Sequence, residues 1–278
     1  MGTLHIDAHQ HFWQFNAVDF GWIGEEECVL KRDFLPNDLK LELSEAEYCG
    51  SIAVQARQSL EETKWLLELA QRHEHILGVV GWVDLQNPKV DRQLDEFSDN
   101  RWLKGIRHVI QDEPDDQFML SPSFLRGISK LAKRNLVYEI LIYAKQLPYA
   151  CELVKQFPRQ KFVLDHIAKP NIKDGAIDSW ALDIEALAAS DNVSVKVSGM
   201  VTEADHKNWK PADFTPYLDV IMDAFGEDRI LVGSDWPVCL LAGSYSQVVR
   251  LAERYFQRAG KQFMDKIQGD NARRIYGL

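Results

Sequence analysis

The chain has 278 residues, 46% of them hydrophobic and 27% charged, which is typical of a globular protein with a substantial apolar core. Its net charge of −10, with no cluster of lysines and arginines, argues against a nucleic-acid partner. The four cysteines are far apart, no signal peptide is visible and no apolar stretch could span a bilayer, so we expect a cytoplasmic protein without a membrane partner.

Short apolar segments alternate with helical segments along the chain. The predicted strands are residues 4–9, 51–55, 77–83, 105–109, 137–142, 162–166, 193–197 and 230–234. Ser59 begins a capping box that predicts a helix to about Arg72. The pairs Ser121-Pro122 and Thr215-Pro216 each predict a helix start, and Phe225-Gly226 predicts a helix end.

Eight strands alternating with helices predict an α/β fold of the (β/α)₈ barrel type, with a single domain over residues 1–278. A doubly wound open sheet is the alternative fold. That fold binds dinucleotides through a Gly-x-Gly-x-x-Gly motif after its first strand, whereas this chain has His9-Gln10-His11 there. The barrel is therefore the favoured architecture.

Polar side chains gather at the predicted carboxyl ends of the strands, where a barrel of this kind carries its active site. They are His9 and His11 (first strand), Gln55 and Arg57 (second), Trp82 and Asp84 (third), Arg107 and His108 (fourth), Tyr143 (fifth), Asp165 and His166 (sixth), Ser198 (seventh) and Asp235 (eighth). Arg107 and His108 are consecutive, so a regular strand turns only one of them inward, and the sequence leaves open which one.

Strand alternation places His9 and His11 on one face, together with His5 and Asp7. Two imidazoles at positions i and i+2 can converge on one metal ion, oxyanion or water molecule.

In the sixth and eighth strands, alternation turns His166 and Asp235 toward the barrel interior and predicts that Asp165 and Ser234 point away. His9, His11, His166 and Asp235 are thus expected to line one cavity.

Several motifs resemble those of a known enzyme group. They are His9-Gln10-His11, GIRH at 105–108, LDHIAKP at 164–170, KVSG at 196–199, GSDWPV at 233–238 and NARRIY at 271–276. Together they resemble the amidohydrolase superfamily (amidohydrolase-related family 2), and more narrowly its sugar-lactonase branch, which includes L-fuconolactonases, L-rhamnonolactonases and pyrone dicarboxylate lactonases. The resemblance covers essentially the whole chain and implies a distorted (β/α)₈ barrel that hydrolyses a lactone ring.

The chain departs from the binuclear members of this superfamily. Those enzymes use a bridging carboxylated lysine or glutamate at the end of the fourth strand and a histidine after the fifth. Here Lys104 stands at the start of the fourth strand and the fifth ends without a histidine, so a two-metal site lacks ligands. His9, His11, His166 and Asp235 can hold at most one divalent ion, zinc being the expected metal, or can act with none.

The resemblance implies that water opens a sugar-derived aldonolactone, with Asp235 as general base. Histidines 9, 11 and 166 would polarise the carbonyl directly or through one metal ion. Arg107 and Gln55 are candidate ligands for substrate oxygen atoms, and Trp82 is a candidate apolar wall. Two alternatives stay open: a metal-dependent decarboxylase of an aromatic acid on the same fold, and a non-catalytic binding protein.

Overall fold

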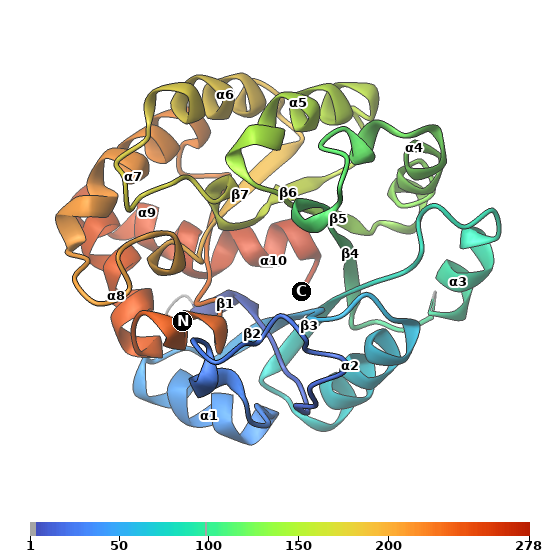
Figure 1. Cartoon of the computed structure of the whole chain (residues 1–278), viewed down its shortest axis with the longest axis horizontal. Helices are drawn as coiled ribbons and strands as arrows, with labels where there is room; N and C mark the ends of the chain where they lie inside the picture. The colour runs from blue at the N-terminus through green and yellow to red at the C-terminus, as the bar shows by residue number, and fades with distance from the viewer. Residues whose placement is uncertain (1–3, 98) are drawn as a thin grey trace.

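Eight parallel strands form the centre of the molecule in the computed structural model, which describes residues 4–97 and 99–278 (Figure 1). The strands are β1 Ile6–Gln10, β2 Gly50–Val54, β3 Ile76–Gly81, β4 Leu103–Val109, β5 Val137–Leu141, β6 Phe162–Leu164, β7 Val193–Val197 and β8 Ile230–Val232. Each strand pairs with the next in the chain, in the order β1 to β8. This order confirms the predicted (β/α)₈ barrel and excludes the doubly wound sheet.

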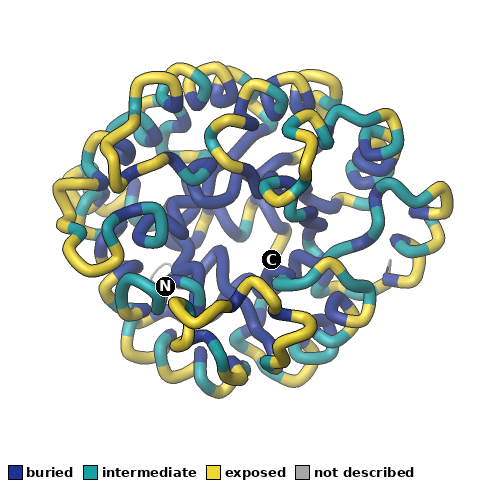
Figure 2. Tube along the Cα trace, in the orientation of Figure 1, coloured by how far each residue is buried: buried dark blue, intermediate teal, exposed yellow. Residues whose placement is uncertain are grey.

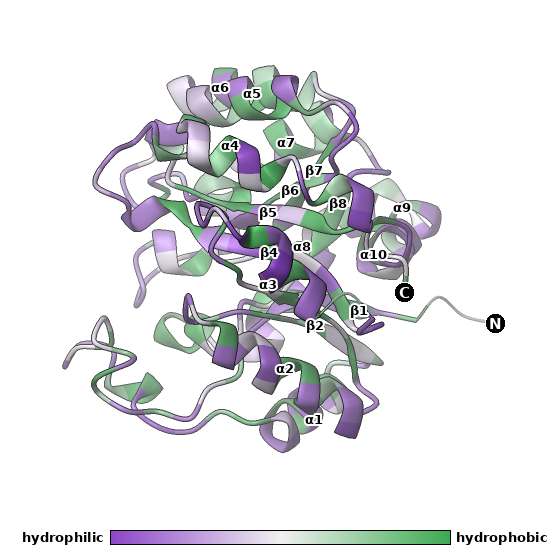
Figure 3. Ribbon diagram, turned by 90° about the vertical axis from the view of Figure 1, so that its right-hand side faces the viewer, coloured by the Kyte–Doolittle hydropathy of each residue, from purple (hydrophilic) through white to green (hydrophobic). Residues whose placement is uncertain are grey.

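Helices surround the strands (Figures 1 and 3). They are α1 Pro36–Glu45, α2 Leu60–Arg72, α3 Val90–Glu96, α4 Pro122–Ile128, α5 Leu147–Gln156, α6 Asp178–Ala188, α7 Pro211–Phe225, α8 Tyr245–Phe256, α9 Lys261–Asp265 and α10 Asn271–Tyr276. Within residues 4–97 and 99–278, each helix is too short or too polar to cross a membrane.

The expected helix ends are mostly confirmed. Ser59 caps α2 by accepting a hydrogen bond from the backbone N–H of Glu62 at 3.0 Å, and Gly226 follows α7 with a φ of 61°. The prediction that Thr215 begins a helix is wrong. The helix α7 begins at Pro211, and the Asp213 carboxylate caps it by accepting a hydrogen bond from the backbone N–H of Lys210. Pro216 therefore stands inside the helix.

The barrel encloses its own apolar core, separate from the larger core between strands and helices. Alternate strand residues supply it: Ile6, Ala8, Ile52, Val54, Val80, Val137, Val163 and Leu231, packed with Ala272, Ile275 and Tyr276 of α10. Figure 2 shows the strands as buried segments. Because α10 covers the amino-terminal ends of the strands, the barrel is accessible from their carboxyl ends.

The barrel closes irregularly between β1 and the segment that follows β8. The backbone N–H of Asp235 donates to the His9 carbonyl at 2.8 Å, and the N–H of His11 donates to the Trp236 carbonyl at 2.7 Å. Gly233 lies so close to β1 that a Cβ atom there would be 2.7 Å from the Cβ of His9. The closure therefore brings His9 and His11, near the start of the chain, next to Asp235, near its end.

Candidate active site

A cavity of about 620 Å³ opens at the carboxyl ends of the strands. Four side chains singled out in the sequence line it: His11, Arg107, His166 and Asp235. Other aromatic and charged side chains also line the cavity, including Trp22, Arg57, Tyr143 and Lys169.

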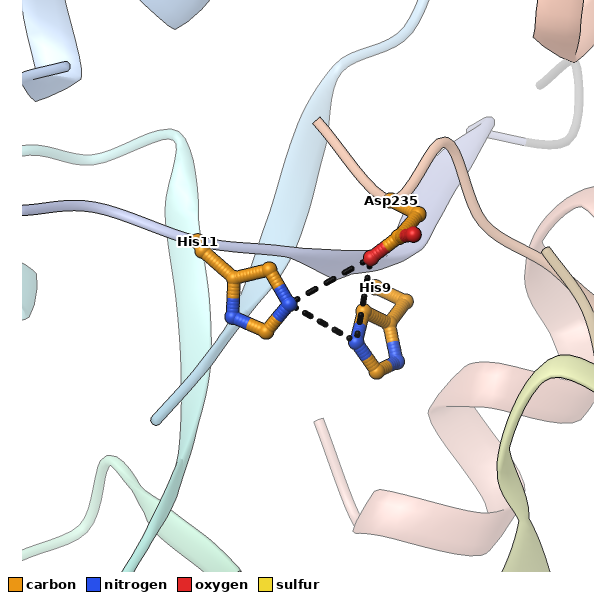
Figure 4. Close-up of side chains that lie close together, drawn as sticks. All are labelled: His9, His11 and Asp235. Carbon is orange, nitrogen blue, oxygen red and sulfur yellow. Dashed lines mark hydrogen bonds and ion pairs between the residues drawn. The ribbon is translucent and has the colours of Figure 1, made fainter. Parts of the chain in front are cut away.

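Three imidazole nitrogens converge on the carboxylate of Asp235. The Nε2 atom of His11 lies 3.4 Å from Asp235 Oδ1, and the Nε2 atoms of His9 and His166 each lie 3.8 Å from it. His9 Nε2 and His11 Nε2 are 3.2 Å apart (Figure 4). All four residues are at most 5% exposed. The structure thus brings the four predicted residues together in one cluster.

Protein partners fix the orientation of two of the imidazoles through their other ring nitrogen. His11 Nδ1 lies 2.8 Å from the carbonyl oxygen of Val54, which can only accept, so Nδ1 carries a hydrogen. His166 Nδ1 lies 2.9 Å from the Ser198 hydroxyl, which can donate or accept. Both rings are therefore held with Nε2 toward Asp235.

His9 is held by a network of buried charges. Its Nδ1 atom lies 3.1 Å from Lys196 Nζ and 3.3 Å from Asp165 Oδ1. Lys196 also pairs with Glu139 at 2.6 Å, and Arg107 pairs with Asp165 at 3.0 Å. Because these charges pair inside the barrel, they form a rigid polar base beneath the cluster.

Burial and neighbouring charges set the protonation of this region. Burial lowers the pKa of both His9 and His166 well below the ordinary 6.5, so these imidazoles are neutral at neutral pH. Burial opposes ionisation of Asp235, but interactions with His166 and His11 outweigh it and lower the pKa of this carboxyl. For Glu139, burial and the charge of Asp165 raise the pKa to about 7. The cluster thus places the neutral imidazoles of His9 and His166 beside the carboxylate of Asp235.

The prediction that Asp7 lies on the same face of β1 as His9 and His11 is wrong. Its carboxylate lies outside the barrel, where it accepts hydrogen bonds from Ser234 Oγ at 2.6 Å and Tyr245 at 3.1 Å, while His9 and His11 face inward. The cause is one extra residue in β1 between its pairings at Asp7 and Gln10, a β-bulge that reverses the alternation.

The prediction that Asp165 points away from the barrel interior is also wrong. Phe162 and Leu164 pack in the outer core, so regular alternation turns Asp165 inward onto Arg107 and Lys196. His166 reaches the cavity because the strand has ended and the backbone enters the left-handed region, with a φ of 52°. Both residues therefore serve the same interior.

Arg107 is the inward member of the pair that the sequence left open. Its guanidinium donates to the Gln55 carbonyl oxygen at 2.5 Å and to Gln55 Oε1 at 2.9 Å, in addition to its pairing with Asp165. Gln55 is wholly buried. The donors of Arg107 are thus largely committed to protein partners.

His108 points the other way and accepts a hydrogen bond from Trp82 Nε1 at 3.3 Å. Trp82 does not line the described cavity, so it does not form the predicted apolar wall; Trp13, Trp22 and Tyr143 are the aromatic side chains in the lining.

The arrangement of the cluster fits a single divalent ion. In a tetrahedral site with metal–nitrogen bonds of about 2.0–2.1 Å, neighbouring ligand atoms are roughly 3.3–3.4 Å apart. The donor atoms of His9, His11 and Asp235 are 3.2 to 3.8 Å apart, and His166 Nε2 lies 3.8 Å from Asp235 Oδ1. Among the residues that the structure describes, two candidate ligand groups occur, and both include His9.

The second candidate group combines His9 and His166 with Asp165, whose oxygens already face Arg107 and Lys196. Cationic neighbours disfavour a metal ion there, so the group around Asp235 is the better metal site.

Sequence reasoning missed Lys196 and Lys169 as members of this region. Both belong to the motifs LDHIAKP and KVSG, so the signal was present as polar residues within otherwise apolar strand ends.

Comparisons with known proteins identify the family of the chain. The family model described as Amidohydrolase matches residues 6–278. A curated L-fucono-1,5-lactonase from Burkholderia multivorans is 40% identical over 289 residues, covering 100% of this chain and 97% of the relative. Another, from Burkholderia ambifaria, is 35% identical over 281 residues, covering 99% and 96%.

A crystal structure of a Burkholderia multivorans amidohydrolase with bound zinc superposes with a TM-score of 0.96 at 39% identity, covering 99% of each chain. The chain therefore belongs to the amidohydrolase family, and it is a hydrolase of the branch that contains the L-fucono-1,5-lactonases.

Proposed function

We propose that the protein hydrolyses the ring ester of an aldonolactone and that L-fucono-1,5-lactone is the first substrate to test. The observation that carries this proposal is the buried carboxylate of Asp235 among three imidazoles at the base of an open cavity. The full-length similarity to two curated L-fucono-1,5-lactonases supports the choice of substrate.

Ester hydrolysis needs a positioned water molecule, a base that takes its proton and hydrogen-bond donors for the carbonyl oxygen. In our proposal Asp235 is the base, because it is ionised and its Oδ1 atom faces the cluster. When His11 Nε2 carries no hydrogen, it can accept a hydrogen bond from the attacking water. The water oxygen bonds to the carbonyl carbon, its proton passes to Asp235, and the ring carbon–oxygen bond then breaks.

His166 is the imidazole best placed to polarise the substrate carbonyl directly. If the Ser198 hydroxyl donates to Nδ1, the hydrogen of the neutral ring lies on Nε2, which faces the cluster. His9, His11, His166 and Asp235 would hold a metal ion in this site. A bound divalent ion supplies a Lewis acid that polarises a carbonyl and acidifies water.

The proposal is tested with purified protein of measured metal content and a panel of aldono-1,5- and 1,4-lactones. Proton release is followed with a pH indicator and product formation by NMR, and spontaneous lactone hydrolysis is subtracted. We expect the highest kcat/KM with a six-carbon 1,5-lactone. Failure to accelerate any lactone would refute the proposal, and carbon dioxide release from an aromatic acid would favour the decarboxylase alternative instead.

A further inference from the structure

The cationic side chains that line the described cavity differ in the number of ion pairs and hydrogen bonds that they form within the protein. Arg57 pairs with Asp19, and Arg107 pairs with Asp165 and donates to Gln55. The ammonium group of Lys169 has neither an ion pair nor a hydrogen bond within residues 4–97 and 99–278. Its positive charge is therefore available to a molecule in the cavity.

The backbone holds Lys169 in an unusual conformation. Four successive residues, from His166 to Lys169, have left-handed φ values of 52°, 49°, 60° and 48°, and none of them is glycine. This conformation costs roughly 1–2 kcal/mol per residue, and such strain persists where the surrounding structure enforces it, often at functional sites. The turn thus places its first and last side chains, His166 and Lys169, in the same cavity.

The surroundings of this turn fix it firmly. Ile167 and Ala168 are fully buried, and the Ile167 carbonyl accepts a hydrogen bond from Trp180 Nε1 at 2.8 Å. The N–H of Lys169 donates to the His166 carbonyl at 2.8 Å. Lys169 is consequently supported by a rigid backbone, and its Nζ atom lies 5.6 Å from the centre of the Tyr143 ring.

The charge of Lys169 acts on the reacting region. It contributes to lowering the pKa of Asp235, which lines the same cavity. A lactone is neutral before reaction, whereas attack by water places negative charge on its carbonyl oxygen while Asp235 gains a proton. A cation that forms no ion pair or hydrogen bond with the described residues then interacts more strongly with the transition state than with the substrate, which is the condition for catalysis.

We propose that Lys169 is a further catalytic residue, whose ammonium group binds the carbonyl oxygen as it becomes negatively charged and then the carboxylate of the ring-opened product. This inference rests on the proposed lactonase function. In this step the carbonyl electron pair moves onto oxygen as the water oxygen bonds to carbon. The pair returns as the ring carbon–oxygen bond breaks, and the proton held by Asp235 goes to the ring oxygen. The carboxylic acid formed then releases its proton to solvent and becomes the carboxylate. Lys169 keeps its own protons throughout.

The test compares Lys169→Met with wild type at matched metal content. Methionine keeps an unbranched apolar stem but has no charge. We expect kcat for L-fucono-1,5-lactone to fall roughly 10²-fold, as when one oxyanion-binding donor is removed, while KM changes less than about threefold. Lys169→Arg, which restores the charge, should recover at least about a tenth of wild-type kcat. Lys173→Met is the matched control, because Lys173 is exposed on the same loop and outside the cavity.

Product binding gives a second readout. L-fuconate should inhibit Lys169→Met at least about tenfold more weakly than wild type, whereas L-fucitol, which lacks the carboxylate, should bind both proteins equally. A Lys169→Met enzyme with kcat near that of wild type and unchanged fuconate inhibition would overturn the inference alone. A wild-type protein that hydrolyses no lactone would instead refute the proposed function.

Discussion

Replacement of Asp235 by asparagine is the sharpest test of the proposed chemistry. Asp235 is 4% exposed and has a left-handed φ of 59°. Asparagine adopts this conformation more readily than most residues and matches aspartate in shape, so Asp235→Asn should fold normally. The substitution therefore removes the negative charge and the proton-accepting oxygen without disturbing the backbone.

The expected loss follows from the contacts of this carboxylate. Its Oδ1 atom is 3.4 to 3.8 Å from three imidazole nitrogens, so this carboxylate is well placed to act as the base. A positioned general base contributes about 10²–10⁴-fold, so kcat should fall by that factor, or by roughly 3–5 kcal/mol in activation free energy. The loss should be greater if Asp235 also holds a metal ion.

The assay is background-corrected lactone hydrolysis at saturating substrate, with circular dichroism to confirm folding and elemental analysis to compare metal content. Asp174→Asn makes the same chemical change at an exposed loop position and should leave kcat unaltered. If Asp235→Asn keeps more than about a tenth of wild-type kcat, another group activates the water and the proposed mechanism is wrong.

Three further outcomes are expected. His166→Asn should lower kcat roughly 10²-fold by removing the proposed donor to the carbonyl, and a change confined to KM would contradict that role. Elemental analysis and calorimetric titration should find at most one zinc ion per chain, with binding lost in His11→Ala; two tightly bound ions would mean that ligands were overlooked. Burial raises the pKa of Glu62 from 4.5 to about 7. In this pH range the folded protein keeps a proton on Glu62 that the unfolded chain loses, so the free energy of unfolding falls as pH rises from about 4.5 to 7. Glu62→Gln should flatten this slope and stabilise the protein at pH 8 by up to about 3 kcal/mol, as urea unfolding at pH 5 and 8 would measure; parallel pH profiles would contradict the assignment.

The architecture and the membership of the cluster follow from simple features of the sequence. Apolar runs alternating with helix signals predict the barrel, and polar residues after those runs identify its active end. His9, His11, His166 and Asp235 are found there because a parallel barrel brings all strand ends to one side.

The directions of individual side chains are less predictable, because they depend on backbone irregularities that tertiary packing imposes. The extra residue in β1 reverses the alternation before His9, and nothing in the local sequence marks the bulge. In the turn from His166 to Lys169, four left-handed residues include neither glycine nor asparagine, the residues that usually signal that conformation. Buried neighbours such as Trp180 hold this turn in place. They are too distant in the sequence for a local sequence pattern to reveal them.

The bulge in β1 also explains how one short strand serves two tasks. By turning Asp7 outward, it lets that carboxylate accept the backbone N–H of Ser234 at 2.9 Å and the Ser234 hydroxyl at 2.6 Å. Those bonds fix the residue before Asp235, which itself has a left-handed backbone and donates its N–H to the His9 carbonyl. Asp7 therefore lies outside the barrel and holds the segment that orients Asp235 toward the imidazoles. Strand alternation had instead predicted that Asp7 shares the inner face with His9 and His11.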